Sequence, residues 1–369
     1  MRVNRLVLSE FRAFHELDME FHGNLTVLVG VNGAGKSSVL EALAILLSPL
    51  VDGIRTVSGK GKRFKVLDIR NKSGQAKGII EISMNGRSFE WSIVTTRPGR
   101  KKSDTSDLGQ LKEALAPIFR GVDEQGLDSV PVAVFYGVHR AVMDIPLRIR
   151  KRHTFDILST YDSSSLGAKS DFRLFFEWFR NREDIENEIR LDLEYHHEDT
   201  QLRAVRTAVE RLTGFSGLRV RRSPLRMEVQ KSGQTLNVAQ LSDGEKCLFA
   251  LVGDLARRLA VANPGYSNPL EGHGVVLIDE IDLHLHPEWQ HKIIPNLLET
   301  FPNCQFIVTT HSPQVLSHIK SENIRLLDQT EDGVKVSEPD GTYGHDSNFL
   351  LKTLFGSTDR PNEPVHPSH

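Results

Sequence analysis

Short apolar runs alternate along the chain with segments of helical spacing. Apolar runs that are bounded by glycine, proline or polar residues predict strands. They occupy residues 5–11, 24–30, 130–137, 274–280 and 304–312. The run at 274–280 is continuously apolar up to its two terminal acids, which is typical of a strand in a parallel sheet covered on both faces.

Longer segments between these runs repeat apolar residues every three or four positions and predict amphipathic helices. They occupy residues 36–47, 245–262 and 287–301, the last with proline at its first position. From 24 to 47 the order is therefore strand, glycine-rich turn and helix. This order predicts an α/β fold, with mixed and parallel β-sheets flanked by helices.

Two regions depart from this alternation. The runs at 64–70, 78–84 and 88–96 predict antiparallel strands, with an Asn-Gly turn between the last two. Residues 170–215 are highly charged, strongly helical and poor in helix breakers, so they predict a helical insertion, most simply one hairpin. This insertion is too short for a long coiled-coil arm.

These patterns divide the chain into four parts. Residues 1–140 are expected to form an N-terminal lobe and 141–216 the helical insertion. Residues 217–340 are expected to form a C-terminal lobe, followed at 341–369 by a short, poorly ordered tail.

Composition restricts the class of protein. The chain has 369 residues, 39% hydrophobic and 25% charged, as in ordinary globular proteins. Cys247 and Cys304 form no Cys-x-x-Cys pair, which argues against zinc and redox motifs and favours a reducing, cytoplasmic setting. The N-terminus lacks a signal-peptide core. The most apolar stretch, 42–51, is too short to span a bilayer, so no membrane partner is expected.

The formal net charge of −2 does not mark a general nucleic-acid binder, although local charge matters more than the sum. Four segments are locally basic: 60–65, 97–102, 148–152 and 219–226. They are either solvated loops and strand edges or surfaces that meet phosphates. Nucleic acid therefore remains a candidate partner.

Residues 30–37, GVNGAGKS, match the phosphate-loop pattern G-x-x-x-x-G-K-[ST] between a predicted strand and a predicted helix. The glycines let backbone N–H groups wrap phosphate oxygens, and the helix N-terminus favours an anion. Lys36 is expected to reach the β- and γ-phosphates of ATP, and Ser37 to ligate Mg²⁺. The predicted nucleotide-binding residues of this loop are Asn32, Gly33, Ala34, Gly35, Lys36, Ser37 and Ser38.

Two later strand ends supply candidate catalytic groups. Asp279 at the tip of one strand is expected to orient Mg²⁺, directly or through water, and Glu280 to polarise the attacking water. His311 follows the next apolar strand in TTHS. A lone histidine is usually structural, but this position favours a hydrogen bond from His311 to the γ-phosphate.

The loop QLSDGEK at 240–246 raises a separate question, because Ser242, Gly244 and the following helix N-terminus predict a second anion-binding surface. One chain has one nucleotide, which the phosphate loop already holds. The second surface is useful only if it faces a nucleotide bound by another copy.

Five motifs occur in the order typical of one known family. FRAF (11–14), GVNGAGKSS, LSDGEK, LIDEID and TTHS resemble those of ABC-type ATPases of the SMC, Rad50 and RecF branch. The resemblance implies a head-to-tail homodimer, or a larger homo-oligomer, with two ATP molecules between subunits. Ser242 and Gly244 would bind the γ-phosphate in trans, Asp282 would belong to the loop that crosses the interface, and Arg12 would lie near the nucleotide.

The residue that approaches Mg²⁺ stays open, and a histidine metal site is not favoured. In this branch a glutamine usually approaches Mg²⁺, and either Gln75 or Asp68 could stand in that place. The histidines of HLHPEWQH do not match a known zinc pattern, so metal binding there is not expected.

Within the branch, residues 278–316 resemble the ATPases of prokaryotic antiphage systems, namely the Septu and retron-associated PtuA type, which is related to the ATPase half of the overcoming-lysogenization-defect nucleases. This resemblance implies a separate effector such as an HNH nuclease, since the chain shows no nuclease motif of its own. Three functions remain: a regulatory ATPase of a defence complex, a RecF-like DNA-repair ATPase, and a nucleotide-gated scaffold with negligible hydrolysis.

Overall fold

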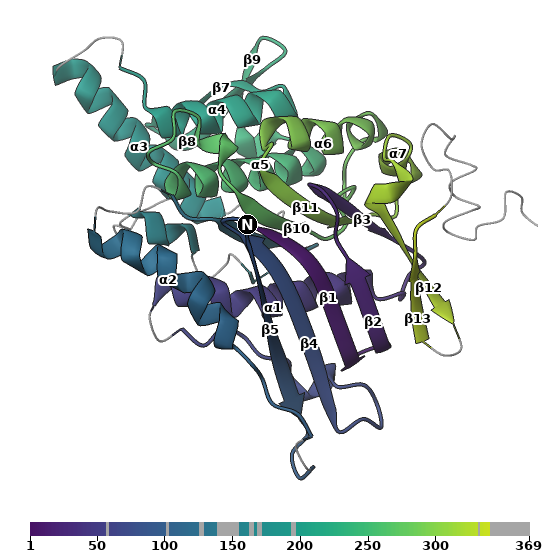
Figure 1. The fold of residues 1–369 in the computed structure, drawn as a ribbon. Coiled ribbons are helices and arrows are strands. Elements are labelled where there is room, and N and C mark those ends of the chain that lie inside the picture. The colour runs from purple at the N-terminus through teal and green to yellow at the C-terminus, as the bar shows by residue number, and fades with distance from the viewer. Residues whose placement is uncertain are drawn as a thin grey trace, which may run out of the picture.

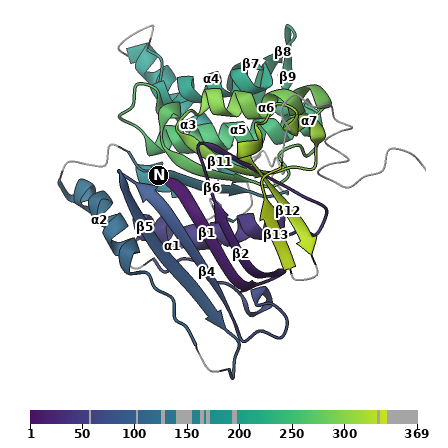
Figure 2. The same cartoon turned by 45° about the vertical axis from the view of Figure 1, so that its right-hand side comes forward.

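The computed structural model describes residues 1–56, 59–100, 103–124, 129–138, 155–161, 166–167, 172–192, 197–330 and 333–339. Two larger sheets and one small sheet are packed with helices (Figures 1 and 2). This arrangement confirms the α/β class predicted from the sequence. The basic segment 148–152 and the tail 341–369 lie outside the described residues.

The central sheet has six strands, and all neighbouring pairs are parallel except the edge pair β12–β13. Every residue of β3, β6, β10 and β11 is buried, as expected of parallel strands with both faces covered. In spatial order the strands are β13 (Gly333–Ser337), β12 (Ile324–Thr330), β3 (Leu25–Val29), β11 (Cys304–Thr309), β10 (Gly274–Ile278) and β6 (Val132–Tyr136).

The second sheet is antiparallel. Alternate residues of β4 are buried, so one face packs on the core and the other is more exposed. In spatial order its strands are β2 (Phe14–Glu20), β1 (Arg2–Phe11), β4 (Gln75–Met84) and β5 (Arg87–Thr96).

The prediction of a strand at 64–70 was wrong. Val66–Asp68 form a short 3-10 helix, and Leu67 is 91% exposed. The Asp68 carboxylate accepts a hydrogen bond from the Lys65 backbone N–H at 2.7 Å. Such a local side-chain bond offers the backbone an alternative to strand pairing.

Helix α1 (Lys36–Arg55) contacts strands of both larger sheets, and it runs well past the predicted end at residue 47. By length and composition α1 could cross a membrane, but 72% of its most apolar 18-residue window is buried inside the protein. Helix α2 (Gly109–Glu124), which was not predicted, packs on β5 and α1.

The remaining helices gather on the other side of the six-stranded sheet, beside the small antiparallel sheet (Figure 1). In the predicted insertion, α4 packs against α5 as well as against α3, so it belongs to this larger helical layer. The helices are α3 (Phe172–Asp192), α4 (Thr200–Thr213), α5 (Asp243–Ala262), α6 (Pro287–Thr300) and α7 (Pro313–Leu316), and the strands are β7 (Ser216–Arg222), β8 (Leu225–Lys231) and β9 (Gln234–Asn237).

Candidate functional site

Three neighbouring parallel strands end at one edge of the central sheet. β3 leads into the phosphate loop, β11 into the TTHS turn, and β10 into the two acids. A cavity of about 240 Å³ opens there, at the carboxyl ends of the strands, where open α/β sheets bind ligands. Its lining residues are Asn32, Gly33, Gly35, Lys36, Ser37, Ser38, Asp279, Glu280, Thr309 and His311.

The cavity therefore brings together most of the residues that the sequence selected. Ala34 is fully buried beneath the loop, and its N–H bonds to the Val31 carbonyl at 3.2 Å. Arg12 lies beside the cavity lining, next to Ser38. Ser242 and Gly244 do not line the cavity.

The loop glycines have specific steric roles. Gly33 and Gly35 have φ of 83° and 98°, in the left-handed region that favours glycine. A Cβ atom on Gly35 would lie 2.6 Å from the Phe14 ring. The loop is therefore fixed against the antiparallel sheet by a contact that only glycine allows.

Lys36 lies along this loop. Its Nζ donates hydrogen bonds to the carbonyls of Gly30 at 2.9 Å and Val31 at 3.1 Å. Burial lowers the pKa of Lys36, while the charges of Asp279 and Glu280 act in the opposite direction. The ammonium group is thus held at the cavity floor by the loop backbone.

Ser37, in the first turn of α1, meets Asp279, which directly follows β10. The Ser37 hydroxyl donates to Asp279 Oδ1 at 3.1 Å. A serine hydroxyl and a carboxylate are hard oxygen donors, which fit the ligand preferences of Mg²⁺. These two side chains could hold the ion that the sequence predicts.

Glu280 follows Asp279 and lines the same cavity. Its backbone has a φ of 47°, a left-handed conformation that is costly for a non-glycine residue. The Glu280 N–H donates to Thr309 Oγ1 at 2.7 Å, which holds the backbone in this conformation. Strain of this kind clusters at functional sites.

Thr309 was missed in the sequence, although it opens the quoted TTHS motif. Its buried hydroxyl accepts the hydrogen bond from Glu280 N–H and donates to Asp279 Oδ1 at 2.7 Å. Thr309, at the end of β11, therefore positions both Asp279 and Glu280. This role is visible only in the fold, where β11 lies beside β10 in the order β3-β11-β10.

Thr309→Val should lower the turnover number for ATP by roughly tenfold to a hundredfold, because the two hydrogen bonds that position the acids are lost. ATP affinity should change less, since the phosphate loop is intact. Thr309→Ser is the matched control, because it keeps the hydroxyl and should recover most of the activity. Steady-state kinetics and direct ATP binding test both expectations. Equal activity in the valine and serine variants would contradict this positioning role.

The turn after β11 holds His311 and Asp282 together. Asp282 Oδ1 accepts hydrogen bonds from Thr310 Oγ1 at 2.6 Å and from His311 N–H at 3.4 Å. The Asp282 carboxylate is thus engaged within its own chain. Burial and the charge of Lys36 lower the pKa of His311, while the charges of nearby acids act in the opposite direction.

Arg12 joins the first hairpin to the phosphate-loop helix. Its guanidinium bonds to Asp68 at 2.9 Å and Ser38 at 3.3 Å, and pairs with Glu41. These contacts fix the cation beside the start of α1.

Neither candidate for the Mg²⁺-approaching glutamine lines the cavity. Asp68 is engaged with Arg12, and Gln75 opens β4 in the other sheet. On the side away from β11, β10 pairs with β6. The Asp279 N–H bonds to the Tyr136 carbonyl at the end of β6, at 2.8 Å. The segment that leaves β6 after Tyr136 therefore starts beside Asp279.

Ser242 and Gly244 shape the start of α5. Ser242 caps this helix in a reciprocal pair with Glu245, with Ser242 N–H donating to Glu245 Oε2 at 2.9 Å. A Cβ atom on Gly244 would lie 2.2 Å from the His284 carbonyl oxygen. Glycine at this position is thus required for contact with the loop that follows β10.

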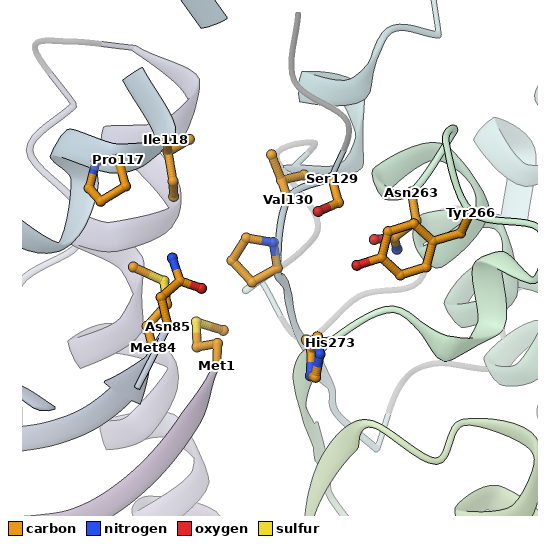
Figure 3. A pocket seen from close by; sticks show the side chains of 11 residues that line it. Met1, Met84, Asn85, Pro117, Ile118, Ser129, Val130, Asn263, Tyr266 and His273 are labelled. Atoms are coloured by element: carbon orange, nitrogen blue, oxygen red, sulfur yellow. The ribbon is translucent and has the colours of Figure 1, made fainter. Parts of the chain in front are cut away.

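A second cavity of about 190 Å³ lies where β6 and β10 begin, at the end of β10 opposite the two acids (Figure 3). Met1 and Asn85 line one side and Tyr266 and His273 the other, just before β10 begins at Gly274. No phosphate-loop or acidic motif residue reaches it. The candidate chemistry therefore belongs to the cavity at the carboxyl ends of the strands.

A known family model matches most of the chain. Residues 25–317 match the family described as "AAA domain, putative AbiEii toxin, Type IV TA system". The chain is 37% identical to the "Retron Ec83 probable ATPase" of Escherichia coli, over 98% of this chain and 78% of that protein.

Two further relatives match over nearly the whole of this chain. The chain is 32% identical to the "Retron Vc95 probable ATPase" of Vibrio cholerae serotype O1 biovar El Tor, over 96% of this chain and 79% of that protein. It is 23% identical to the Septu protein PtuA of Bacillus thuringiensis, over 99% of this chain and 86% of that protein.

A solved structure shares the fold. The crystal structure of the SMC head bound to the C-terminal winged-helix domain of ScpA superposes with a TM-score of 0.55. It is 17% identical and covers 91% of this chain and 97% of that chain.

Proposed function

Because the chain belongs to the AAA-domain family and to that of the retron-associated probable ATPases, we propose that it binds and hydrolyses ATP in a prokaryotic antiphage defence complex. Its fold, shared with an SMC head, supports a place in the SMC, Rad50 and RecF branch of ABC-type ATPases. The setting is the cytoplasm. The observation that supports the ATPase most directly is the shared cavity of phosphate loop, Asp279, Glu280 and His311. The resemblance to retron and Septu proteins supports the defence role.

Each side chain has a definite task in this proposal. Lys36 leaves its backbone carbonyl partners and binds the β- and γ-phosphates of ATP. Ser37 and Asp279 hold Mg²⁺, which supplies charge neutralisation at the phosphates when bound. Glu280 accepts a hydrogen bond from the attacking water and orients it toward the γ-phosphate. His311 donates a hydrogen bond to the γ-phosphate.

A second copy completes the site in this proposal. Ser242 and Gly244 lie outside the cavity of their own chain but present a capped helix N-terminus, which favours an anion. In a head-to-tail homodimer, this surface would meet the γ-phosphate bound by the partner. ATP would then hold two copies together, and hydrolysis would release them.

The regulatory output is control of a separate effector, and an HNH nuclease is the chemical class that the PtuA-type resemblance favours. A RecF-like repair ATPase is the alternative function. The two differ in what stays bound to the ATP state: a stoichiometric protein in the first, and nucleic acid alone in the second.

The test is purification of the Glu280→Gln protein with ATP and Mg²⁺ from cells that carry the neighbouring genes. We expect a stoichiometric partner protein with Glu280→Gln, because this variant traps the ATP state. The partner should be absent from the Lys36→Ala protein, which cannot form that state. Recovery of nucleic acid alone, released by salt, would favour the repair function. Recovery of the same proteins with both variants would contradict ATP-dependent control.

A further inference from the structure

Gln290 lies in the segment HLHPEWQH, near the start of α6, and it does not line the cavity of the candidate site. α6 contacts α7, and the two helices lie beside each other in Figures 1 and 2. Each of these helices follows a loop of the candidate site. Residues 281–286, between the two acids and α6, are called the β10–α6 loop, and residues 310–312, between β11 and α7, are called the β11–α7 turn.

The side-chain amide of Gln290 bonds to both of these segments. Its Nε2 donates to the Leu285 carbonyl at 2.8 Å, and its Oε1 accepts from Ser312 Oγ at 2.6 Å. A carbonyl oxygen can only accept, so the contact with Leu285 decides which end of the amide is the nitrogen. Ser312 is buried, and its hydroxyl also lies 2.9 Å from Oε1 of Gln314. The Gln290 amide therefore bridges the two segments through its donor and its acceptor.

This bridge and the Asp282 carboxylate hold the β11–α7 turn on the two sides of His311 in sequence. Asp282, in the β10–α6 loop, accepts hydrogen bonds from Thr310 Oγ1 and from the His311 N–H. Gln290 accepts from Ser312, which directly follows His311. The backbone position of His311 therefore depends on where the β10–α6 loop lies.

The same loop also packs against the surface formed by Ser242 and Gly244. The His284 carbonyl oxygen lies so close to Gly244 that a Cβ atom there would approach it to 2.2 Å. His284 directly precedes Leu285, whose carbonyl the Gln290 amide binds. Because close-packed atoms must move together, a shift of Gly244 displaces His284 and Leu285, and the hydrogen bond carries this shift to Gln290.

We propose that Gln290 is a positioning residue for ATP hydrolysis. It couples the Ser242–Gly244 surface to the β11–α7 turn, so that His311 takes its place at the γ-phosphate when a second copy docks. This role rests on the proposed function, because it concerns the ATP site shared by two copies. Gln290 does not line the cavity, so it acts through Ser312 and His311 and not on the nucleotide itself.

The test compares Gln290→Leu with Gln314→Leu in the full chain. Leucine fills much of the same volume as glutamine but forms no side-chain hydrogen bonds, so Gln290→Leu removes both bonds of the bridge. Gln314→Leu is the matched control, because it removes the other acceptor beside the Ser312 hydroxyl and leaves the bond to Leu285 in place. Thermal unfolding verifies that both variants are folded. Phosphate release is measured over a range of ATP and protein concentrations, and ATP binding is measured directly.

Gln290→Leu should lower kcat by about tenfold, because the dimer forms around ATP but His311 is displaced from the γ-phosphate. The affinity for ATP and the protein concentration that gives half-maximal specific activity should both stay within about twofold of the wild type. A purely structural loss would instead change the unfolding temperature or the assembly. The Gln314→Leu protein should match the wild type in all of these measurements.

Combination with His311→Ala shows whether Gln290 acts through His311. The double variant should be no slower than His311→Ala alone, since the group that Gln290 positions is already gone. With an active wild type, additive losses in the double variant would overturn this role, as would equal rates for Gln290→Leu and Gln314→Leu. A wild-type protein no faster than Lys36→Ala would overturn the proposed function itself, and this role with it.

Discussion

Glu280→Gln is expected to retain ATP and to lose turnover by roughly two or more orders of magnitude. The amide has nearly the size of the carboxylate, so the left-handed backbone at residue 280 and its bond to Thr309 should persist. The amide is far less able to polarise a water molecule. The variant should therefore bind ATP with wild-type affinity and hold it unhydrolysed.

Direct ATP binding and phosphate release under single-turnover conditions measure the two effects separately. Glu288→Gln is a suitable control, since Glu288 is an exposed carboxylate on α6 that pairs with Lys292. This control should hydrolyse ATP normally. A Glu280→Gln protein that matches the wild-type rate would exclude the water-activating role. A wild-type protein with equally negligible hydrolysis would favour the nucleotide-gated scaffold.

Ser242→Arg is expected to bind ATP normally but to lose ATP-dependent dimerisation, and with it about two orders of magnitude of hydrolysis. Ser242 lies outside the cavity of its own chain, so the substitution leaves the phosphate loop intact. In the proposed dimer, a long cationic side chain would occupy the narrow space between the capped helix and the partner's γ-phosphate.

Loss of the helix cap could by itself weaken α5, by about 1 kcal/mol. Ser242→Ala removes the same cap without adding bulk, so it separates the two causes and should retain much of the dimerisation. Light scattering with ATP and Mg²⁺ measures the assembly of both variants. Normal hydrolysis by Ser242→Arg would show that the signature loop does not act in trans.

The sequence was informative wherever the chemistry lies in one continuous segment. The phosphate loop, Asp279 with Glu280, and His311 could all be selected because each follows an apolar strand. The structure then places these strand ends around one cavity.

Contacts between distant segments could not be predicted in this way. The role of Thr309 depends on β11 lying between β3 and β10, and the contact of Gly244 with His284 depends on how α5 meets the loop after β10. The segment 64–70 has the composition of a strand, yet the local bond of Asp68 turns it into a 3-10 helix.

The basic segments illustrate the same limit. Residues 60–65 and 219–226 look alike as sequence, although only the second segment receives acids from a distant helix. Glu183 and Asp184 reach Arg222 from α3, whereas the single acid within residues 59–74 is Asp68, and Arg12 already binds it. Charge availability is a property of the fold.

The central claim is that each ATP site is shared between two copies, and a mixed assembly tests it most directly. Lys36→Ala removes the phosphate-binding lysine, and Ser242→Arg blocks the Ser242–Gly244 surface that faces the partner. Neither variant should therefore hydrolyse ATP alone. Co-expressed with different tags and purified through both, they should form dimers in which one of the two sites is intact, with about half the wild-type rate if the sites act independently. A mixed dimer as inactive as its parents would contradict the shared site.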